Sequence, residues 1–316
     1  MESADFTFQT EDGTRLHVSG WAVEEPKAIV QVLHGIAEHG SRYARLAEAL
    51  ARAGYTTYAH DHRGHGKSLL EGSPPGHIAD SDGWSLLVED SHAVNREISR
   101  RHPGLPIIVL GHSMGSFVLQ QLLFEYPRDM VAAAVSGSNG KPPAIAAVGK
   151  LLARIERARV GRRRPSPIIQ SLTFGGYNKA FAPARTEFDW LSRDTDEVDA
   201  YIADTLCGFA VSTQTWLDML NALGRIANPD NVARVKLLGG YDVRYGLHKG
   251  MKWREVPRHW MLNFALTVRP GDGKYRRIRR TCTLEYLDRS RELVASSRLC
   301  KRERKMLEPR QGIKTR

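Results

Sequence analysis

The sequence predicts an α/β protein with a mostly parallel central sheet, flanked by helices and carrying an inserted helical cap. Three observations support this fold class. Apolar runs alternate with amphipathic segments over residues 1–139, as in parallel strands joined by helices. Residues 140–215 lose this alternation and are predicted to form the cap. Residues 216–316 begin with a helix that completes the core and continue into an atypical basic tail.

The first half of the predicted core opens with a hairpin. In FTFQTEDGTRLHVSGW (residues 6–21), two alternating segments flank EDG, a turn signal. AIVQVLHG (28–35) is a continuous apolar run that ends in glycine, which is typical of a strand buried on both faces. SRYARLAEALARAG (41–54) has helical spacing between a serine and a glycine, and YTTYAHD (55–61) is a second strand candidate.

The second half of the core continues the alternation. DGWSLLVEDSHAVNREISRRHPG (82–104) is predicted to be a long helix that a Pro-Gly pair stops. PIIVLG (106–111) and VAAAVSGS (131–138) are predicted strands, and SFVLQQLLFEYP (116–127) between them is a predicted helix. This order implies right-handed crossovers in a parallel sheet.

The predicted cap begins with AIAAVGKLLARIERARVGRRRPS (144–166), an amphipathic basic helix that ends in a loop rich in helix breakers. FDWLSRDTDEVDAYIADTLCGF (188–209) follows it, and TWLDMLNALGRIAN (215–228) returns to an ordinary helix. The basic side chains of the first helix admit two interpretations, a solvated face or a transient contact with an anionic membrane surface. They are Lys150, Arg154, Arg157 and Arg159.

Composition indicates a globular protein. Hydrophobic residues make up 41% and aromatic residues 8% of the chain, and no apolar run approaches the length of a membrane span. The start, MESADFTFQTEDG, lacks a signal-peptide pattern, so we expect a cytoplasmic protein that is peripheral to a membrane if the cap touches one. We expect no cofactor. The cysteines are too few and too scattered for a disulfide framework or a metal site; they are Cys207, Cys282 and Cys300.

The positive charge is concentrated in the last quarter of the chain. The net charge is +11, but residues 235–316 hold 22 lysines and arginines against 8 acidic residues, which leaves 24 against 27 elsewhere. A basic tail can contact nucleic acid or an anionic membrane, or it can simply be solvated. This tail has neither interleaved aromatic residues nor a recognition helix, so we expect no nucleic-acid partner.

GHSMG (111–115) is the strongest functional signal. It matches the pattern G-x-S-x-G between a predicted strand and a predicted helix, the context of a nucleophile elbow. Gly111 and Gly115 permit the strained turn that exposes the Ser113 hydroxyl, and the helix N-terminus favours developing negative charge. The alternative is an ordinary glycine-rich turn between a strand and a helix.

A nucleophilic serine needs a base and donors for the oxyanion. Histidine is the usual base, and in this arrangement the acid and then the histidine follow the serine along the chain. The only histidines after Ser113 in the sequence are His248 and His259. Two backbone N–H groups are expected to hold the oxyanion, one from Met114 and one from Ile36 in the loop after an earlier strand.

Two loops are rich in histidine and glycine. In LHGIAEHG, His34 and Gly35 form a predicted tight turn whose glycine lets the loop approach the serine. DHRGHGKS (61–68) lacks the glycine spacing of a phosphate-binding loop, and Asp61 and Arg63 are interpreted as structural. The histidines around this second loop are too crowded to assign as metal ligands, and no carboxylate cluster accompanies them; they are His60, His62 and His65.

Together these pieces resemble the monoacylglycerol lipase and lysophospholipase group of α/β-hydrolases. The similar pieces, within residues 5–234, are VLHGIAEHGSRYARLAEALARAGY, AHDHRGHGKS, VLGHSMGS and FDWLSRDTDEVDAYIADTLCGF. The resemblance implies an α/β-hydrolase fold, Ser113 as nucleophile, the Ile36 and Met114 amides as oxyanion donors, and a cap that shapes an acyl pocket. Supporting positions of the same motifs are His34, Gly35, Gly111, His112 and Gly115.

The resemblance also implies positions for the other two members of a catalytic triad. The family has its acid in a turn after a late strand, where VKLLGGYDVRYG offers Asp242, and its histidine in a segment that PRHWMLN resembles, which offers His259. The lead-in to Asp242 is short, only 17 residues separate it from His259, and no clear late helix follows. Residues 235–316 are therefore either a diverged, working C-terminal part or foreign sequence such as a frameshift product.

We therefore expect a serine carboxylic-ester hydrolase that cleaves a single-chain lipid ester, a monoacylglycerol or a lysophospholipid, through an acyl-enzyme. The expected partners are the lipid ester and, transiently, a membrane surface that the cap touches. The alternative is a catalytically impaired, hydrolase-like protein whose tail leaves Ser113 without a base.

Overall fold

One sheet of eight strands forms the centre of the part of the chain that the structure describes. The computed structural model describes residues 1–138, 145–236 and 267–268, all within a compact unit that extends from Met1 to Arg269. The strand order is β1-β3-β5-β4-β6-β7-β8, and β2 pairs with β3. The strands are β1 (Glu2–Ser3), β2 (Phe6–Gln9), β3 (Arg15–Ala22), β4 (Ala28–Leu33), β5 (Tyr55–His60), β6 (Ile107–His112), β7 (Ala132–Ser136) and β8 (Thr267–Val268).

The sheet has a parallel centre and antiparallel edges. β4 pairs parallel with β5 and with β6, and β6 pairs parallel with β7. The predicted hairpin is confirmed, because β2 and β3 pair antiparallel with Phe6 opposite Val18. Every residue of β4 is buried, which confirms the prediction of a strand covered on both faces, and every residue of β5 is buried as well.

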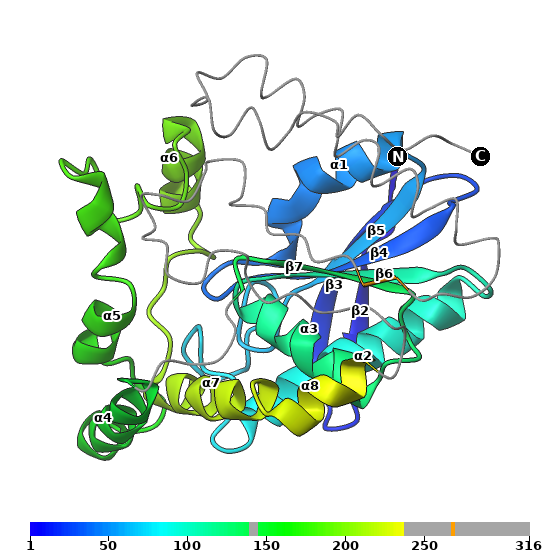
Figure 1. Cartoon of the computed structure of the whole chain (residues 1–316). Coiled ribbons are helices and arrows are strands. Elements are labelled where there is room, and N and C mark those ends of the chain that lie inside the picture. The colour runs from blue at the N-terminus through cyan, green and yellow to red at the C-terminus, as the bar shows by residue number, and fades with distance from the viewer. Residues whose placement is uncertain (139–144, 237–266, 269–316) are drawn as a thin grey trace, which may run out of the picture. The chain divides into compact units, whose positions relative to one another are not determined.

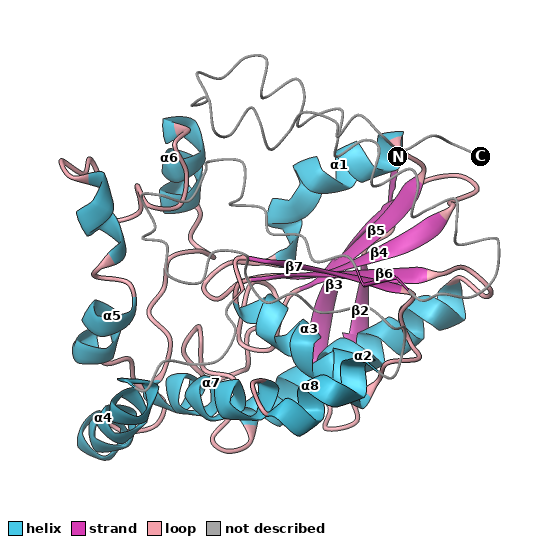
Figure 2. Ribbon diagram, viewed as in Figure 1, coloured by secondary structure: helices cyan, strands magenta, loops and turns pink. Residues whose placement is uncertain are grey.

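Helices cover both faces of the sheet (Figure 1), and Figure 2 shows the two kinds of element in separate colours. On one face α1 packs against β3 and β5; on the other α3 packs against β4, β6 and β7 and is itself contacted by α2, α7 and α8. These helices are α1 (Ala44–Arg52), α2 (Gly83–Arg101), α3 (Met114–Glu125), α7 (Thr213–Ile226) and α8 (Pro229–Lys236). The helix predicted over residues 41–54 begins as a 3-10 turn, Gly40–Tyr43, before α1.

Between β7 and α7 the described residues form helices and no strand. These are α4 (Ile145–Val160), α5 (Pro167–Thr173), the 3-10 helix η2 (Tyr177–Phe181) and α6 (Thr195–Ala203). We call residues 145–204 the helical segment, and its first helix, α4, packs against α7. Among the described residues, no helix combines the length and the apolar character that crossing a membrane requires.

The carboxyl ends of β4 and β6 bring the two key loops together. Leu33, the last residue of β4, pairs with Gly111 in β6. A Cβ atom on Gly115 would lie 2.1 Å from the Leu33 carbonyl oxygen, and one on Gly111 would lie 2.4 Å from the Gly115 carbonyl oxygen. Only glycine therefore lets α3 start this close to β4, which explains both glycines of GHSMG in physical terms.

Candidate active site

Ser113 stands at a strained bend between β6 and α3. Its backbone has φ 51° and ψ −118°, which a residue with a Cβ atom rarely adopts. The side chain is partly exposed, whereas the next residue, Met114, is buried. A strained, accessible serine at the start of a helix is the geometry of a nucleophile elbow.

Hydrogen bonds on both sides hold this bend. The Ser113 N–H donates to the Ser136 carbonyl oxygen over 2.9 Å, and the Ser113 carbonyl oxygen accepts from the Ser116 hydroxyl over 2.6 Å. The preceding His112 places its Nδ1 3.1 Å from the Ser136 hydroxyl. The surrounding structure therefore compensates for the strain at Ser113.

His34 shapes the loop after β4. It is fully buried, and burial holds the pKa of its imidazole well below the usual value, so the ring is neutral. Its Nε2 accepts from the His62 N–H over 2.9 Å, so the proton stays on Nδ1, which donates to the Gly35 carbonyl oxygen over 2.7 Å. His34 is thus a hydrogen-bonded core histidine that fixes the start of this loop.

Gly35 and Glu38 bring this loop against the serine. A Cβ atom on Gly35 would lie 3.2 Å from the Ser113 Cβ and 2.6 Å from the Glu38 Oε1. The buried Glu38 carboxylate accepts from the Gly35 N–H over 2.6 Å and from Arg42 over 2.5 Å. It also accepts from the Tyr43 hydroxyl over 3.1 Å, so one carboxylate ties together the whole turn.

Two backbone N–H groups stay available beside Ser113. They belong to Ile36, in the loop after β4, and to Met114, the first residue of α3. Within the described part of the chain, neither N–H donates a hydrogen bond to another residue. Such amides are the kind of donor that can hold a developing oxyanion, which is the role that the sequence predicts for them.

The sequence of this chain matches a known family. The family model described as serine aminopeptidase, S33, matches residues 24–240. The chain belongs to this family. The matched residues include both the loop after β4 and the elbow at Ser113.

Relatives of this S33 chain carry lipase names. It is 32% identical to the monoacylglycerol lipase of Mycolicibacterium smegmatis over 209 residues, which cover 64% of this chain and 65% of that protein. It is 29% identical to the human monoglyceride lipase over 225 residues, which cover 68% of this chain and 64% of that protein. The chain thus spans about two thirds of the length of the relatives that it matches.

Solved structures share the fold. A thermostable carboxyl esterase from Bacillus coagulans, solved with glycerol, superposes with a TM-score of 0.66 at 22% identity and covers 74% of this chain and 76% of that chain. A lipase in its open form superposes with a TM-score of 0.64 at 22% identity, over 73% and 75% of the two chains. The S33 chain therefore has the α/β-hydrolase fold that the sequence predicts.

The remaining members of the predicted triad lie outside the described residues. Asp242 and His259, and the other histidine that follows the serine, His248, all fall within residues 237–266. The family match ends at residue 240, before all three. Their roles stay predictions from the sequence.

The loop after β5 is structural, as predicted. Asp61 accepts from the Gly40 N–H and the Lys67 N–H, each over 2.7 Å. Arg63 forms a bidentate ion pair with the buried Asp90: its Nε donates to Oδ2 over 2.9 Å and its Nη2 to Oδ1 over 2.8 Å. Three histidines at the end of β5 and in this loop are fully buried, and desolvation lowers their pKa values, so they are neutral core residues; they are His60, His62 and His65.

The helical segment reaches the loop after β4 through Ala37. The Tyr201 hydroxyl in α6 donates to the Ala37 carbonyl oxygen over 2.9 Å, and the Gly208 N–H donates to the same oxygen over 3.0 Å. Ala37 itself has φ 56°. These contacts hold the residue next to Ile36 in a conformation that non-glycine residues rarely adopt.

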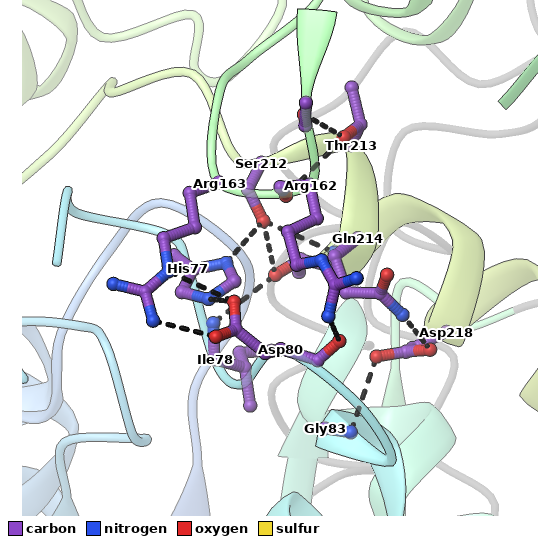
Figure 3. Close-up of polar contacts among 12 residues, drawn as sticks. His77, Ile78, Asp80, Gly83, Arg162, Arg163, Ser212, Thr213, Gln214 and Asp218 are labelled. Atoms are coloured by element: carbon purple, nitrogen blue, oxygen red, sulfur yellow. Dashed lines mark hydrogen bonds and ion pairs between the residues drawn. The ribbon is translucent and has the colours of Figure 1, made fainter. Parts of the chain in front are cut away.

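A second polar cluster joins the loop before α2 to the chain just after α4 and to the start of α7 (Figure 3). His77, in the loop before α2, contacts the Ser212 hydroxyl at 3.0 Å and Asp80 at 3.2 Å. Asp80 in turn accepts from Arg163, just after α4, at 2.9 and 2.6 Å. Ser212 caps α7, so this cluster fixes where the chain leaves α4 and where it enters α7.

Sequence reasoning missed several of these positioning residues. Glu38 lies in the loop after β4, and the fold of this turn brings its carboxylate to the Gly35 N–H. The spacing of residues in the sequence does not reveal that contact. Tyr201 and His77 contact residues more than a hundred positions away, at Ala37 and Ser212. The local signal was Glu38 itself, the acidic residue in a turn otherwise made of apolar residues, glycines and histidines.

Proposed function

We propose that this chain is a serine carboxylic-ester hydrolase that cleaves a single-chain lipid ester, a monoacylglycerol or a lysophospholipid, through an acyl-enzyme. The observation that carries the proposal is the strained Ser113, with φ 51°, beside the unpaired N–H groups of Ile36 and Met114. The names of the bacterial and human relatives favour a monoacylglycerol as the substrate.

The proposed reaction follows from this geometry. The Ser113 hydroxyl attacks the ester carbonyl carbon while a histidine base takes its proton, and the carbonyl oxygen becomes an oxyanion held by the two amides. Collapse releases the alcohol, protonated by the same histidine, and leaves the fatty acyl group on Ser113. Water then attacks the acyl-enzyme and releases the fatty acid. His259 is the proposed base, oriented by Asp242.

Transient membrane contact through the helical segment belongs to the same proposal. α4 exposes apolar side chains at helical spacing, with Val148 64%, Leu151 57% and Ile155 53% exposed. Of its basic residues, Arg157 bonds Gln214 and Arg159 pairs with Glu156, which leaves fewer cations for lipid headgroups. Lys150 and Arg154 stand on the same helix. Exposed apolar side chains on a helix that also carries basic residues suit an interfacial helix of a peripheral protein.

A second candidate is a hydrolase-like protein without activity. The observation that favours it is the end of the family match at residue 240, before the proposed acid and base. In that case Ser113 keeps its geometry but has no group to accept its proton, and the hydroxyl stays a poor nucleophile.

Hydrolysis assays separate the two candidates. The full chain is tested on p-nitrophenyl butyrate, a monoacylglycerol and a lysophospholipid, beside Ser113→Ala, His259→Ala and His248→Ala. Loss of activity in Ser113→Ala and His259→Ala, but not in His248→Ala, supports the hydrolase with the proposed base. Loss in His248→Ala instead moves the base to that residue. An inactive but folded full chain supports the second candidate.

A further inference from the structure

Three side chains with metal-binding atoms converge beside the loop that carries Ile36. They are His39 at the end of this loop, Asp204 just after α6, and Cys207 three residues later. One ligand atom from each lies within 4.8 Å of the other two. His39 is buried, and Cys207 is a partly exposed free cysteine, so the cluster is enclosed on one side and accessible on the other.

We propose that His39, Asp204 and Cys207 form a site for a divalent, thiophilic cation such as Zn²⁺. Imidazole nitrogen, carboxylate oxygen and thiolate sulfur are the three ligand types that zinc takes in proteins, and three protein ligands leave a fourth position for water. Tetrahedral zinc places its ligand atoms about 3.3–3.8 Å apart. The His39 Nε2 and Asp204 Oδ2 atoms are 2.7 Å apart, so the partly exposed Asp204 and Cys207 side chains would both adjust to reach this spacing.

The hydrogen bonds of the cluster show which protons a cation would replace. The Asp204 carboxylate accepts from the His39 Nε2–H over 2.7 Å and from the Cys207 thiol. A cation binds the thiolate form of cysteine, so binding releases the thiol proton as the sulfur–metal bond forms. The imidazole proton moves to Nδ1, which leaves Nε2 free to bind the cation.

Neighbouring groups already support this arrangement. The Ser41 hydroxyl lies 2.9 Å from the His39 Nδ1 and can accept its proton, which fixes the metal-binding tautomer. The Leu206 N–H donates to the Asp204 Oδ1 over 2.9 Å and orients the carboxylate. A bound cation would join the loop after β4 to the end of the helical segment, close to Ile36.

Cadmium titration of the full chain tests the site without reference to hydrolysis. We expect one equivalent of Cd²⁺ to produce a thiolate charge-transfer band, and Zn²⁺ to displace it. The band disappears in Cys207→Ser and is retained in the matched double variant Cys282→Ser/Cys300→Ser. Ser41→Ala, which removes the proton acceptor, lowers the affinity about 10-fold.

Asp204→Asn is the second variant, because its amide oxygen can still accept from His39 and so preserves the fold; its affinity for Zn²⁺ falls at least about 10-fold. Far-ultraviolet circular dichroism confirms folding of each variant. A cadmium band that persists in Cys207→Ser, or its absence from the unaltered chain, would overturn the proposal and leave the three residues as a hydrogen-bonded link.

Discussion

The loops after the neighbouring parallel strands β4 and β5 are both rich in histidine and glycine, yet their polar groups differ in which backbone N–H groups they bind. In the loop after β4, Glu38 folds the turn so that the Ile36 N–H stays unpaired among the described residues, beside Ser113. In the loop after β5, Asp61 accepts two N–H groups and Arg63 is paired with Asp90. The two loops therefore differ in whether a backbone donor near Ser113 is left unpaired among the described residues, and not in how polar they are.

The largest effect is expected where β4 touches the elbow. Gly115→Ala should prevent folding, because the new Cβ atom would lie 2.1 Å from the backbone oxygen of Leu33 in the central strand. Soluble yield and circular dichroism measure the outcome. Gly149→Ala in α4 is the control, since a Cβ atom there meets nothing within 4 Å. A folded Gly115→Ala protein of unchanged melting temperature would show that the close approach of α3 and β4 is not required.

A substitution in the loop after β5 should change the stability of the protein but not its catalytic rate. Arg63→Gln leaves the buried Asp90 carboxylate without its charged partner and should lower the free energy of unfolding by about 3–5 kcal/mol. The kcat of the folded fraction should not change. Arg100→Gln, at an exposed pair with Glu97, is the control and should have no measurable effect on denaturant unfolding. If Arg63→Gln lost kcat without losing stability, the loop after β5 would have a catalytic role and would no longer differ from the loop after β4.

Acid should destabilise the fold through the buried histidines of the loop after β5. Burial lowers the pKa of His60 and of His65 to about 4 from 6.5, so the unfolded chain binds more protons between these pH values. Their stabilising contribution is complete above pH 6.5 and is lost as the pH falls toward 4. Each histidine adds a slope of up to about 1.4 kcal/mol per pH unit.

Urea unfolding at a series of pH values measures this slope. His65→Gln removes one titrating group and should flatten the dependence between pH 6.5 and 4. An equally steep dependence in this variant would mean that other groups govern the acid unfolding.

The smallest effect is expected from Glu38, in the loop after β4. Glu38→Ala removes the acceptor of the Gly35 N–H and should lower kcat by about 10-fold to 100-fold, less than the roughly 10²–10³-fold loss of an oxyanion donor itself. KM should change less than kcat. Glu38→Gln retains an acceptor oxygen and should recover part of the rate. Equal kcat values in the unaltered chain, Glu38→Ala and Glu38→Gln would mean that Glu38 does not position the Ile36 N–H group.

Much of the core could be predicted because its signals are local. β4 and the first strand–helix units are apolar runs and amphipathic segments of ordinary length. The strained bend at Ser113 could be predicted because backbone contacts at the bend require the glycines that flank it. α8 was not singled out: it begins at Pro229, a residue that usually ends a helix pattern but is also favourable in the first helical turn.

The long-range contacts of the site could not be predicted in the same way. His39 and Asp204 are separated by 165 positions, and cysteine spacing alone gave no sign that Cys207 would join them. Tyr201 likewise meets Ala37 only because the helical segment folds back onto the core. Such pairs depend on tertiary packing, which leaves no period in the sequence.

Labelling with a fluorophosphonate tests most directly whether Ser113 is an activated nucleophile. The full chain is incubated with the probe, and intact mass and peptide mapping locate the adduct. We expect one adduct per chain, at Ser113, which is absent from Ser113→Ala and retained in Arg63→Gln. A folded full chain that takes up no probe, or takes it up equally in Ser113→Ala, would contradict it.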